Sequence, residues 1–224
     1  MIEIISATRF SEADFWGKSA LGISLRRLSH DKRLVARIAF QNQLGLPSIY
    51  NSRISEAAND SILVFMHDDV WIDDYFLADH VNAGLRVYDV IGVAGNKQRA
   101  EFQPAWTFLD DKYTPADRKN LSGSVATGKN PFSAILYFVG VPAECELLDG
   151  VFIAARKSVL KEKGVSFDTR FDFNFYDLDF CRSARQNGLR LGTWPISLTH
   201  QSDGKFGSKQ WIDKFYVYFD KWKS

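Results

Sequence analysis

The sequence predicts an α/β fold with a mostly parallel central sheet flanked by helices. Two observations lead to this prediction. Strand-like and helix-like segments alternate over roughly the first 96 residues, as in βαβ units. Residues 61–66 (SILVFM) are apolar without interruption, which is typical of a strand buried on both faces. The chain of 224 residues is long enough to bury its own core, and we expect a single domain over residues 1–224.

Local patterns predict the other elements of the N-terminal part. Ser11 and Asp14 resemble a capping box with Asp in place of Glu, so a helix is expected to begin there. Pro47 suits the first turn of a second helix. The remaining segments are strands at 2–7, 33–41 and 89–94, the last closed by Gly95-Asn96, and an amphipathic helix near 72–86 with Tyr75, Leu77, Val81 and Leu85 on its apolar side.

The second part of the chain begins with a segment of weak periodicity, residues 97–131, which we interpret as a long excursion from the core. The elements expected after it are strands at 133–139, 146–155 and 189–198 and a helix at 176–187. The tail, 208–223, places Trp211, Phe215, Tyr218 or Phe219, and Trp222 on one helical face. The tail is short and only mildly basic, which favours docking on the domain; contact with a membrane surface or a partner protein is the alternative.

Composition and charge exclude several classes of protein. The net charge is +1, from 28 basic and 27 acidic residues, so the chain has no general attraction for nucleic acid. Cys145 and Cys181 form no disulfide framework, and we find neither a signal peptide nor a membrane span, so a cytoplasmic location is expected. No GxGxxG, GxxxxGK[ST], GxSxG or HExxH motif occurs.

A first group of polar residues, His67-Asp68-Asp69, directly follows the most apolar strand. In open α/β sheets, ligands bind outside the carboxyl ends of the strands. Two adjacent carboxylates repel each other unless a cation joins them, and Mg²⁺ and Mn²⁺ accept such oxygen ligands. The alternative is a pair of acids that begins a loop and caps the next helix.

A second group, Tyr176-Asp-Leu-Asp179, opens a helix after a Phe-rich segment. An acid in an apolar wall has a raised proton affinity, which suits a general base. The alternative is favourable interaction of the acids with the helix dipole.

Two further features point to a cleft. Asp149 and Gly150 interrupt an apolar run, and a buried carboxylate must pair or line a cleft. His200 ends the last strand and precedes a Gly-bounded loop that could close over a site.

In their order, these segments resemble family 2 glycosyltransferases with the GT-A fold, in particular a small HDD-containing subgroup related to a streptomycin-biosynthesis-type glycosyltransferase domain. The resemblance covers roughly residues 2–204. Its matching stretches are GLPSIYN (45–51), ILVFMHDDV (62–70), VIGVAGN (90–96), LLDGVFIAARKSVL (147–160), FDTRFDFNFYDLDFCRSARQNG (167–188) and His200. It implies a mostly parallel Rossmann-like sheet with a small antiparallel excursion, a nucleotide-binding half (1–96), an acceptor and catalytic half (97–204), and a C-terminal loop and helix (205–224).

The resemblance also implies a chemistry: inverting transfer of a sugar from a UDP- or dTDP-type donor to a hydroxyl of a glycan or small molecule, with Mn²⁺ or Mg²⁺ and a place in polysaccharide biosynthesis. Asp177 would be the general base, and Asp69 and His200 would bind the metal. The nucleotide-sugar residues would be Thr8, Arg9, Asn51, His67 and Asp68. The acceptor or sugar residues would be Asp149, Gly150, Tyr176 and Asp179, with Trp106, Phe175 or Trp194 as a stacking aromatic.

The sequence departs from the family pattern at a few positions. His67 replaces the first acid of the metal motif, and Tyr176 replaces the acid before the base. Asn42 and Gln43 occupy the region of the usual base-recognising acid. Acceptor specificity must come from the 97–131 excursion, the tail or another protein. A GT-A-like domain that binds nucleotide sugar or glycan without turnover is therefore the main alternative, ahead of a nucleotidyltransferase and an HD phosphohydrolase.

Overall fold

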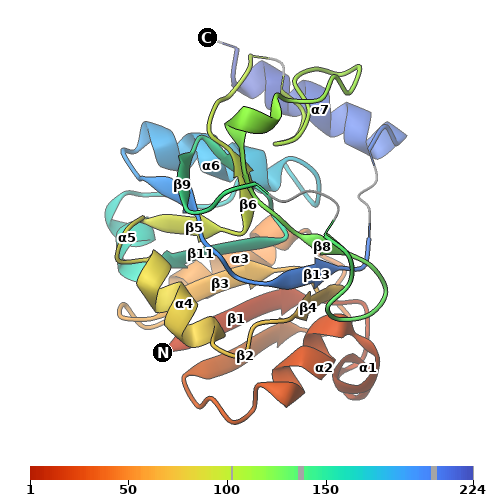
Figure 1. Ribbon diagram of the computed structural model, residues 1–224, viewed down its shortest axis with the longest axis vertical. Coiled ribbons are helices and arrows are strands. Elements are labelled where there is room, and N and C mark those ends of the chain that lie inside the picture. The colour runs from red at the N-terminus through yellow and green to blue at the C-terminus, as the bar shows by residue number, and fades with distance from the viewer. Residues whose placement is uncertain (102, 136–138, 203–205, 224) are drawn as a thin grey trace.

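The computed structural model describes residues 1–101, 103–135, 139–202 and 206–223. Within them, the largest sheet has seven strands in the order β2-β1-β3-β11-β5-β12-β9 (Figure 1). Five of these strands run in one direction, and β11 and β9 run against their neighbours. The strands are β1 (Ile2–Ala7), β2 (Leu34–Ala39), β3 (Ile62–Met66), β5 (Val90–Gly92), β9 (Ala143–Cys145), β11 (Phe152–Arg156) and β12 (Leu191–Thr193). The prediction of a mostly parallel α/β sheet is confirmed.

Helices cover both faces of this sheet. The helices are α1 (Glu12–Lys18), α2 (Ala20–Arg27), α3 (Leu46–Glu56), α4 (Leu77–Gly84), α5 (Lys157–Glu162), α6 (Tyr176–Gln186) and α7 (Lys209–Lys221). Neighbouring strand residues point to opposite sides, so Phe65 belongs to the hydrophobic cluster that includes residues of α3, α5, α6 and α7, whereas Val64 belongs to the cluster that includes residues of α1, α2 and α4. All five residues of β3 are buried, as the apolar run predicts.

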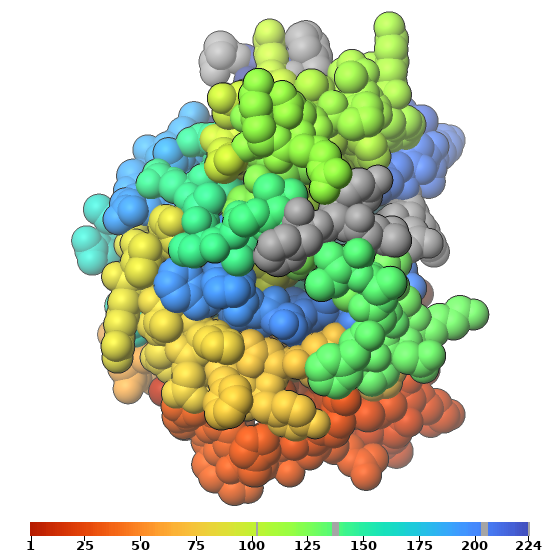
Figure 2. Space-filling model, in the orientation of Figure 1, coloured from red at the N-terminus to blue at the C-terminus, as the bar shows by residue number. Residues whose placement is uncertain are grey.

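Two small sheets stand beside the large one. One joins β10 (Leu147–Leu148), β6 (Ala94–Asn96) and β7 (Leu121–Gly123); the other joins β4 (Val70–Ile72), β13 (Leu198–His200) and β8 (Ala126–Thr127). A short 3₁₀ turn, Arg118–Asn120, precedes β7. The 97–131 excursion supplies β7 and β8, and its residues lie across the top and down the right side of the face in Figure 2 (yellow-green to green).

Local signals explain where several helices begin. The Ser11 hydroxyl accepts a hydrogen bond from the Asp14 backbone N–H at 3.2 Å, so α1 begins as predicted. Pro47 lies in the first turn of α3, also as predicted. The helix that begins at Ser11 is interrupted at Ser19, whose hydroxyl accepts from Gly22 N–H at 2.9 Å and caps the separate helix α2.

Several predicted boundaries were wrong because strands leave the large sheet for the small ones. The helix expected near 72–86 begins only at Leu77, since residues 70–72 pair with β13, and Tyr75 is exposed. The strand expected at 89–94 is divided between β5 and β6, and β6 includes Gly95 and Asn96 because it pairs with β7 and β10.

The later strands divide in the same way. The expected strand 146–155 is β10 and β11, separated at Asp149 and Gly150. The expected strand 189–198 is β12 and β13, with Pro195, which lacks a backbone N–H, between them. Residues 133–135 are not a strand, and 136–138 of the expected strand 133–139 lie outside the described residues.

The C-terminal helix docks on the domain. Trp211, Phe215 and Tyr218 of α7 are buried and pack around Phe175, next to α6 (Figure 1). Among the described residues, no helix has the length and apolarity needed to cross a membrane. Contact of the outer side of α7 with a membrane surface or another protein stays a prediction.

Candidate active site

Three side chains from separate segments meet at the carboxyl end of β3. His67 directly follows β3, Asp69 directly precedes β4, and His200 is the last residue of β13. Antiparallel pairing sets His200 opposite Val70 and therefore beside Asp69. The distance from His200 Nε2 to Asp69 Oδ1 is 3.2 Å. One nitrogen or oxygen atom from each of the three residues lies within 4.8 Å of the others, so they form a candidate cation cluster.

The charge states in this cluster suit a divalent cation. Burial raises the pKa of Asp69, but the hydrogen bond and charge of His200 outweigh it, and the net pKa is lowered. Burial lowers the pKa of His67, which favours its neutral ring. One carboxylate with two imidazoles is a donor set that fits Mn²⁺ better than Mg²⁺, because Mg²⁺ prefers oxygen ligands. The donor chemistry therefore fits the expected cation, with His67 as an additional ligand.

Helix α6 presents Asp177 from the other side. Phe175, just before the helix, has a φ of 66°, a left-handed conformation that is uncommon for a bulky residue. The Gly150 N–H donates to Asp177 Oδ2 at 3.0 Å. Burial and the negative charge of Asp149 raise the pKa of Asp177 to about 7, against the lowering effect of backbone hydrogen bonds. A carboxyl group with this pKa can accept a proton near neutral pH.

Asp149 is held by two hydrogen bonds. The Trp106 indole N–H donates to Oδ2 at 2.6 Å, and the Val151 N–H donates to Oδ1 at 2.8 Å. These two bonds supply the partners that a carboxylate needs when it is removed from water. Trp106 lies in the 97–131 excursion, so this bond ties the excursion to the core at the site.

Tyr176 and Gly150 connect the two sides. The Tyr176 hydroxyl lies 2.8 Å from His67 Nε2 and donates to the Gly150 carbonyl oxygen at 2.9 Å. Gly150 has no room for a side chain, because a Cβ atom there would lie 2.5 Å from Tyr176 Oη and 2.9 Å from Asp177 Cβ. The glycine is therefore required by the close approach of α6.

One cavity of about 510 Å³ joins these groups, within the usual size range of small-molecule sites. Its polar lining includes His67, His200, Asp149, Tyr176 and Asp177. Aromatic side chains make up much of the rest: Trp106, Phe108, Phe173, Phe175, Phe206 and Trp211. The excursion and the C-terminal segment therefore both contribute walls to the cavity.

The structure places other predicted residues beside the cluster or away from it. Thr8 lies beside Asp68 and forms a hydrogen bond with it. Burial raises the pKa of Asp68, and the hydrogen bond with Thr8 only partly opposes this effect. Arg9 is exposed at the end of β1. Trp194 packs in the core on the α4 side instead of the cavity, whereas Trp106 and Phe175 line the cavity.

Asn51 and Asp179 are not brought to the cavity. The Asn51 amide exchanges hydrogen bonds with the Phe167 backbone at 2.7 and 2.9 Å, so it fixes the segment before α6. Asp179 faces α7, where its Oδ1 lies 2.7 Å from Lys221 Nζ and accepts from Trp222 Nε1 at 2.8 Å. Both side chains are occupied by structural contacts.

Sequence reasoning missed Phe108, Phe206 and Trp211 as cavity residues. Trp211 was expected only to dock the tail on the domain. It packs in the core and also lines the cavity. Phe108 and Phe206 come from segments of weak periodicity, and their edge-to-face contact at 5.4 Å joins residues 98 positions apart. No local pattern could have indicated that contact.

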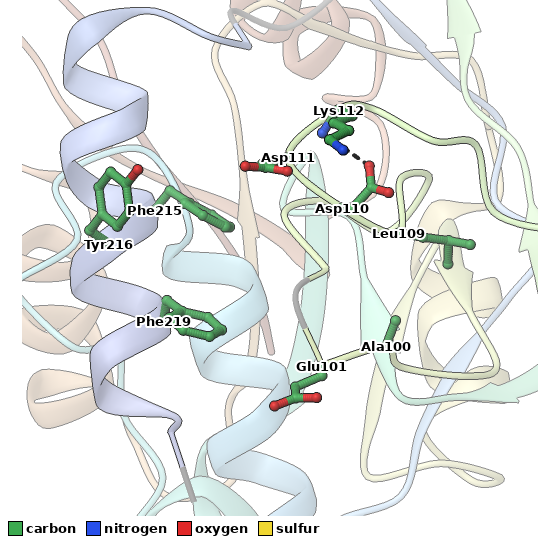
Figure 3. A pocket seen from close by; sticks show the side chains of 9 residues that line it. All are labelled: Ala100, Glu101, Leu109, Asp110, Asp111, Lys112, Phe215, Tyr216 and Phe219. Atoms are coloured by element: carbon green, nitrogen blue, oxygen red, sulfur yellow. Dashed lines mark hydrogen bonds between the residues drawn. The ribbon is translucent and has the colours of Figure 1, made fainter.

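A second cavity of about 490 Å³ lies between α7 and the excursion (Figure 3). Phe215, Tyr216 and Phe219 line one side, and residues 100–101 and 109–112 line the other. None of the predicted site residues lines it, so the chemistry is expected in the first cavity.

Comparison with known proteins gives a match in structure alone. No family model and no curated protein sequence matches the chain. The catalytic domain of Drosophila β1,4-galactosyltransferase 7, in complex with xylobiose, matches with a TM-score of 0.51 at 11% identity, over 96% of this chain and 79% of that one. S. aureus TarS 1–349 in complex with UDP matches at 0.52 and 15% identity, over 97% of this chain and 64% of that one.

GalNAc-T7 with UDP, GalNAc and Mn²⁺ matches at 0.53 and 10% identity, over 99% of this chain and 48% of that one. At such low identity, these similarities concern the fold. The narrower assignment to the HDD-containing subgroup of family 2 stays a prediction. The chain has the GT-A-like fold that these glycosyltransferases share.

Proposed function

We propose that this chain is a metal-dependent inverting glycosyltransferase that moves a sugar from a nucleotide-diphosphate sugar to an acceptor hydroxyl. One observation carries the proposal: Asp177, with a pKa of about 7, borders the same cavity as His67 and His200 of the cation cluster. A proton acceptor and a cation site are the two groups that such a transfer needs.

Asp177 is the general base in this proposal. The acceptor oxygen attacks the anomeric carbon, its proton passes to Asp177, and the bond from that carbon to the diphosphate oxygen breaks. Asp69, His200 and His67 are the residues that would hold Mn²⁺, which when bound neutralises the charge of the diphosphate leaving group. Aromatic residues around the cavity exclude water and offer faces for a sugar ring.

The donor is proposed to be of the UDP or dTDP type and to bind at the carboxyl ends of β1 and β3. Thr8, Arg9 and Asp68 are the residues proposed to contact it, within the nucleotide-binding half, 1–96. Two of the similar structures, TarS and GalNAc-T7, are complexes with UDP, which supports a uridine donor. The acceptor, a glycan or a small molecule, is proposed to bind against Asp149, Gly150 and the walls from the half 97–204.

A nucleotide-release assay tests the proposal. UDP-, dTDP- and GDP-sugars would be incubated with Mn²⁺, and release of nucleoside diphosphate would be measured with water or a panel of glycans as acceptor. We expect release from one donor class, dependent on Mn²⁺, stimulated by the correct acceptor and abolished by Asp69→Asn. Release that is indifferent to Mn²⁺ and unchanged in Asp69→Asn would contradict the proposed site.

A binding domain without turnover is a second candidate, because His67 and Tyr176 stand where the family pattern has acids. The same samples distinguish the two functions. Metal-dependent binding of UDP in a calorimeter, with no release from any donor or acceptor combination, would favour the binding domain.

A further inference from the structure

The hydroxyl group of Tyr176 contacts both the cation cluster and the glycine that holds the base. The residue is the first of α6 and is only 2% exposed. Its Oη lies 2.8 Å from His67 Nε2 and 2.9 Å from the Gly150 carbonyl oxygen. The backbone N–H of the same Gly150 donates to Asp177. The Tyr50 side chain also forms a hydrogen bond with Tyr176, so this buried hydroxyl has its polar partners inside the protein.

The hydrogen bonds determine which nitrogen of His67 carries the hydrogen. A phenol has one proton to donate, and a carbonyl oxygen can only accept. The Tyr176 proton therefore points to Gly150, and the hydroxyl can meet His67 Nε2 only as an acceptor. Nε2 of His67 must then carry a hydrogen. In a neutral imidazole, the other nitrogen, Nδ1, keeps the lone pair.

We propose that Tyr176 is a positioning residue: its hydroxyl holds His67 as the Nε2–H tautomer, so that Nδ1 is the atom that His67 offers to the cation. This inference rests on the proposed function through the metal site. It changes the role of Tyr176, which the sequence predicted as a contact of the acceptor or sugar. Ligating histidines usually donate their second N–H to a carboxylate or carbonyl group, which fixes ring and tautomer. Here the tyrosine hydroxyl is that acceptor.

The proposal has a consequence for the identity of the cation. With the tautomer fixed, the cluster offers two imidazole nitrogens and one carboxylate. Such a set disfavours Mg²⁺, which prefers oxygen ligands, relative to a first-row transition-metal dication such as Mn²⁺. His67 stands where the family pattern has an acid, and Tyr176 keeps the Nδ1 lone pair of this histidine available to the cation.

The first test needs no metal. Nitrogen-15 NMR of the metal-free protein at about pH 8, above the ordinary histidine pKa of about 6.5, reports the tautomer of each imidazole. His67 is assigned by its loss in His67→Gln. We expect the Nε2–H tautomer for His67. The Nδ1–H tautomer in the wild-type protein would overturn the proposal.

The second test measures Mn²⁺ affinity directly, by electron paramagnetic resonance of the free ion. Tyr176→Phe keeps the ring and removes the hydroxyl, and we expect its dissociation constant for Mn²⁺ to rise about tenfold to hundredfold. Tyr88→Phe is the matched control, because Tyr88 is also buried but packs against Gly192, away from the cavity.

The outcomes of the second test separate the two proposals. Equal Mn²⁺ affinity in wild type and Tyr176→Phe would overturn only the role of Tyr176. A wild-type chain that binds no Mn²⁺ would overturn the metal-dependent function itself, whatever tautomer the first test finds. Weaker binding in Tyr176→Phe, with Tyr88→Phe unchanged, would support both.

Discussion

Asp177 and Asp179 lie two residues apart on α6, yet they face different regions of the molecule. Asp177 borders the cavity, accepts the Gly150 N–H and has Asp149 as its charged neighbour. Asp179 faces α7, where Lys221 and Trp222 contact it. Burial raises the pKa of both carboxyl groups; among the described residues, Lys221 lies beside Asp179 and opposes this effect, whereas Asp149 raises the pKa of Asp177 further.

This difference distinguishes a reactive acid from a structural one. Both are first-turn acids in one YDLD motif, so helix-dipole capping explains them equally well. The surroundings separate their roles: an acid that faces a cavity beside another acid is poised to take a proton, whereas an acid bridged to Lys221 fixes a helix. Each of the five predictions below tests this comparison.

The largest effect is expected from Asp177→Asn. The amide can still accept the Gly150 N–H but cannot take a proton from an acceptor. We expect turnover, measured as acceptor-stimulated release of nucleoside diphosphate, to fall about 10²- to 10⁴-fold, with Mn²⁺ affinity unchanged. A fall of less than about threefold would remove Asp177 from the role of base.

The pH dependence of turnover should follow Asp177. Below pH 7 the carboxyl group is protonated and cannot act as a base, so turnover should rise about tenfold per pH unit up to about pH 7 and then level off. A rate profile from pH 5 to 9 measures this rise. A profile that is already flat above pH 5 would contradict a raised pKa.

The raised pKa of Asp177 should also make the stability of the fold depend on pH. The pKa of Asp177 in the folded chain, about 7, exceeds its ordinary value of 3.8, so the folded state binds more protons between these values. The contribution of Asp177 to stability is therefore full below about pH 4 and is lost as pH rises through 7. Relative to the wild type, Asp177→Asn should gain in Tm across this window.

Gly150→Ala should disturb both sides of the cavity at once. The added Cβ would crowd Tyr176 Oη and Asp177 Cβ, and misplacement of catalytic groups by about 1 Å can cost about 10²-fold in rate. We expect turnover to fall about 10- to 100-fold. Gly17→Ala is the control, since nothing lies within 4 Å of the added atom there. Equal turnover in both variants would show that the approach of α6 to Gly150 is not needed.

The smallest effect on activity is expected from Asp179→Asn. Lys221 loses one of its two carboxylate partners, Asp179, and keeps Asp168. Burial outweighs this ion pair and leaves the pKa of Asp179 raised, so the uncharged amide should keep the Tm within about 4 °C of the wild type, a change of about 1 kcal/mol or less. The rate and pH profile should stay within about twofold of the wild type. A change in the pH profile as large as that of Asp177→Asn would remove the distinction between the two acids.

Sequence reasoning predicted the parts of the fold in which local pattern and environment agree. The apolar run at 62–66 is buried on both faces, Ser11 caps α1 and Pro47 begins α3. It failed where a strand passes from one sheet to another, as after Val90–Gly92 and Leu191–Thr193. Period-2 patterning records which residues are buried but not which sheet buries them.

The part of the site that could be predicted consists of residues next to the ends of predicted strands. His67 directly follows the core strand β3, where the rule for ligand sites at strand ends places it, and antiparallel pairing of β13 with β4 adds His200 beside Asp69. Asp177 and Asp179 could not be told apart, because their difference depends on α7, which comes more than 30 residues later. The role of Asn51 likewise depends on Phe167, 116 positions away.

The most direct test of the account is a thermal-unfolding titration with UDP, with and without Mn²⁺, in the wild type and Asp69→Asn, with Asp179→Asn as control. A ligand at about a hundred times its dissociation constant adds about 2.7 kcal/mol, which for this chain length raises Tm by about 5–10 °C. We predict this rise in the wild type and in Asp179→Asn, only when UDP and Mn²⁺ are both present, and its loss in Asp69→Asn. No rise in the wild type, or the same rise in Asp69→Asn, would contradict the proposed metal-dependent donor site.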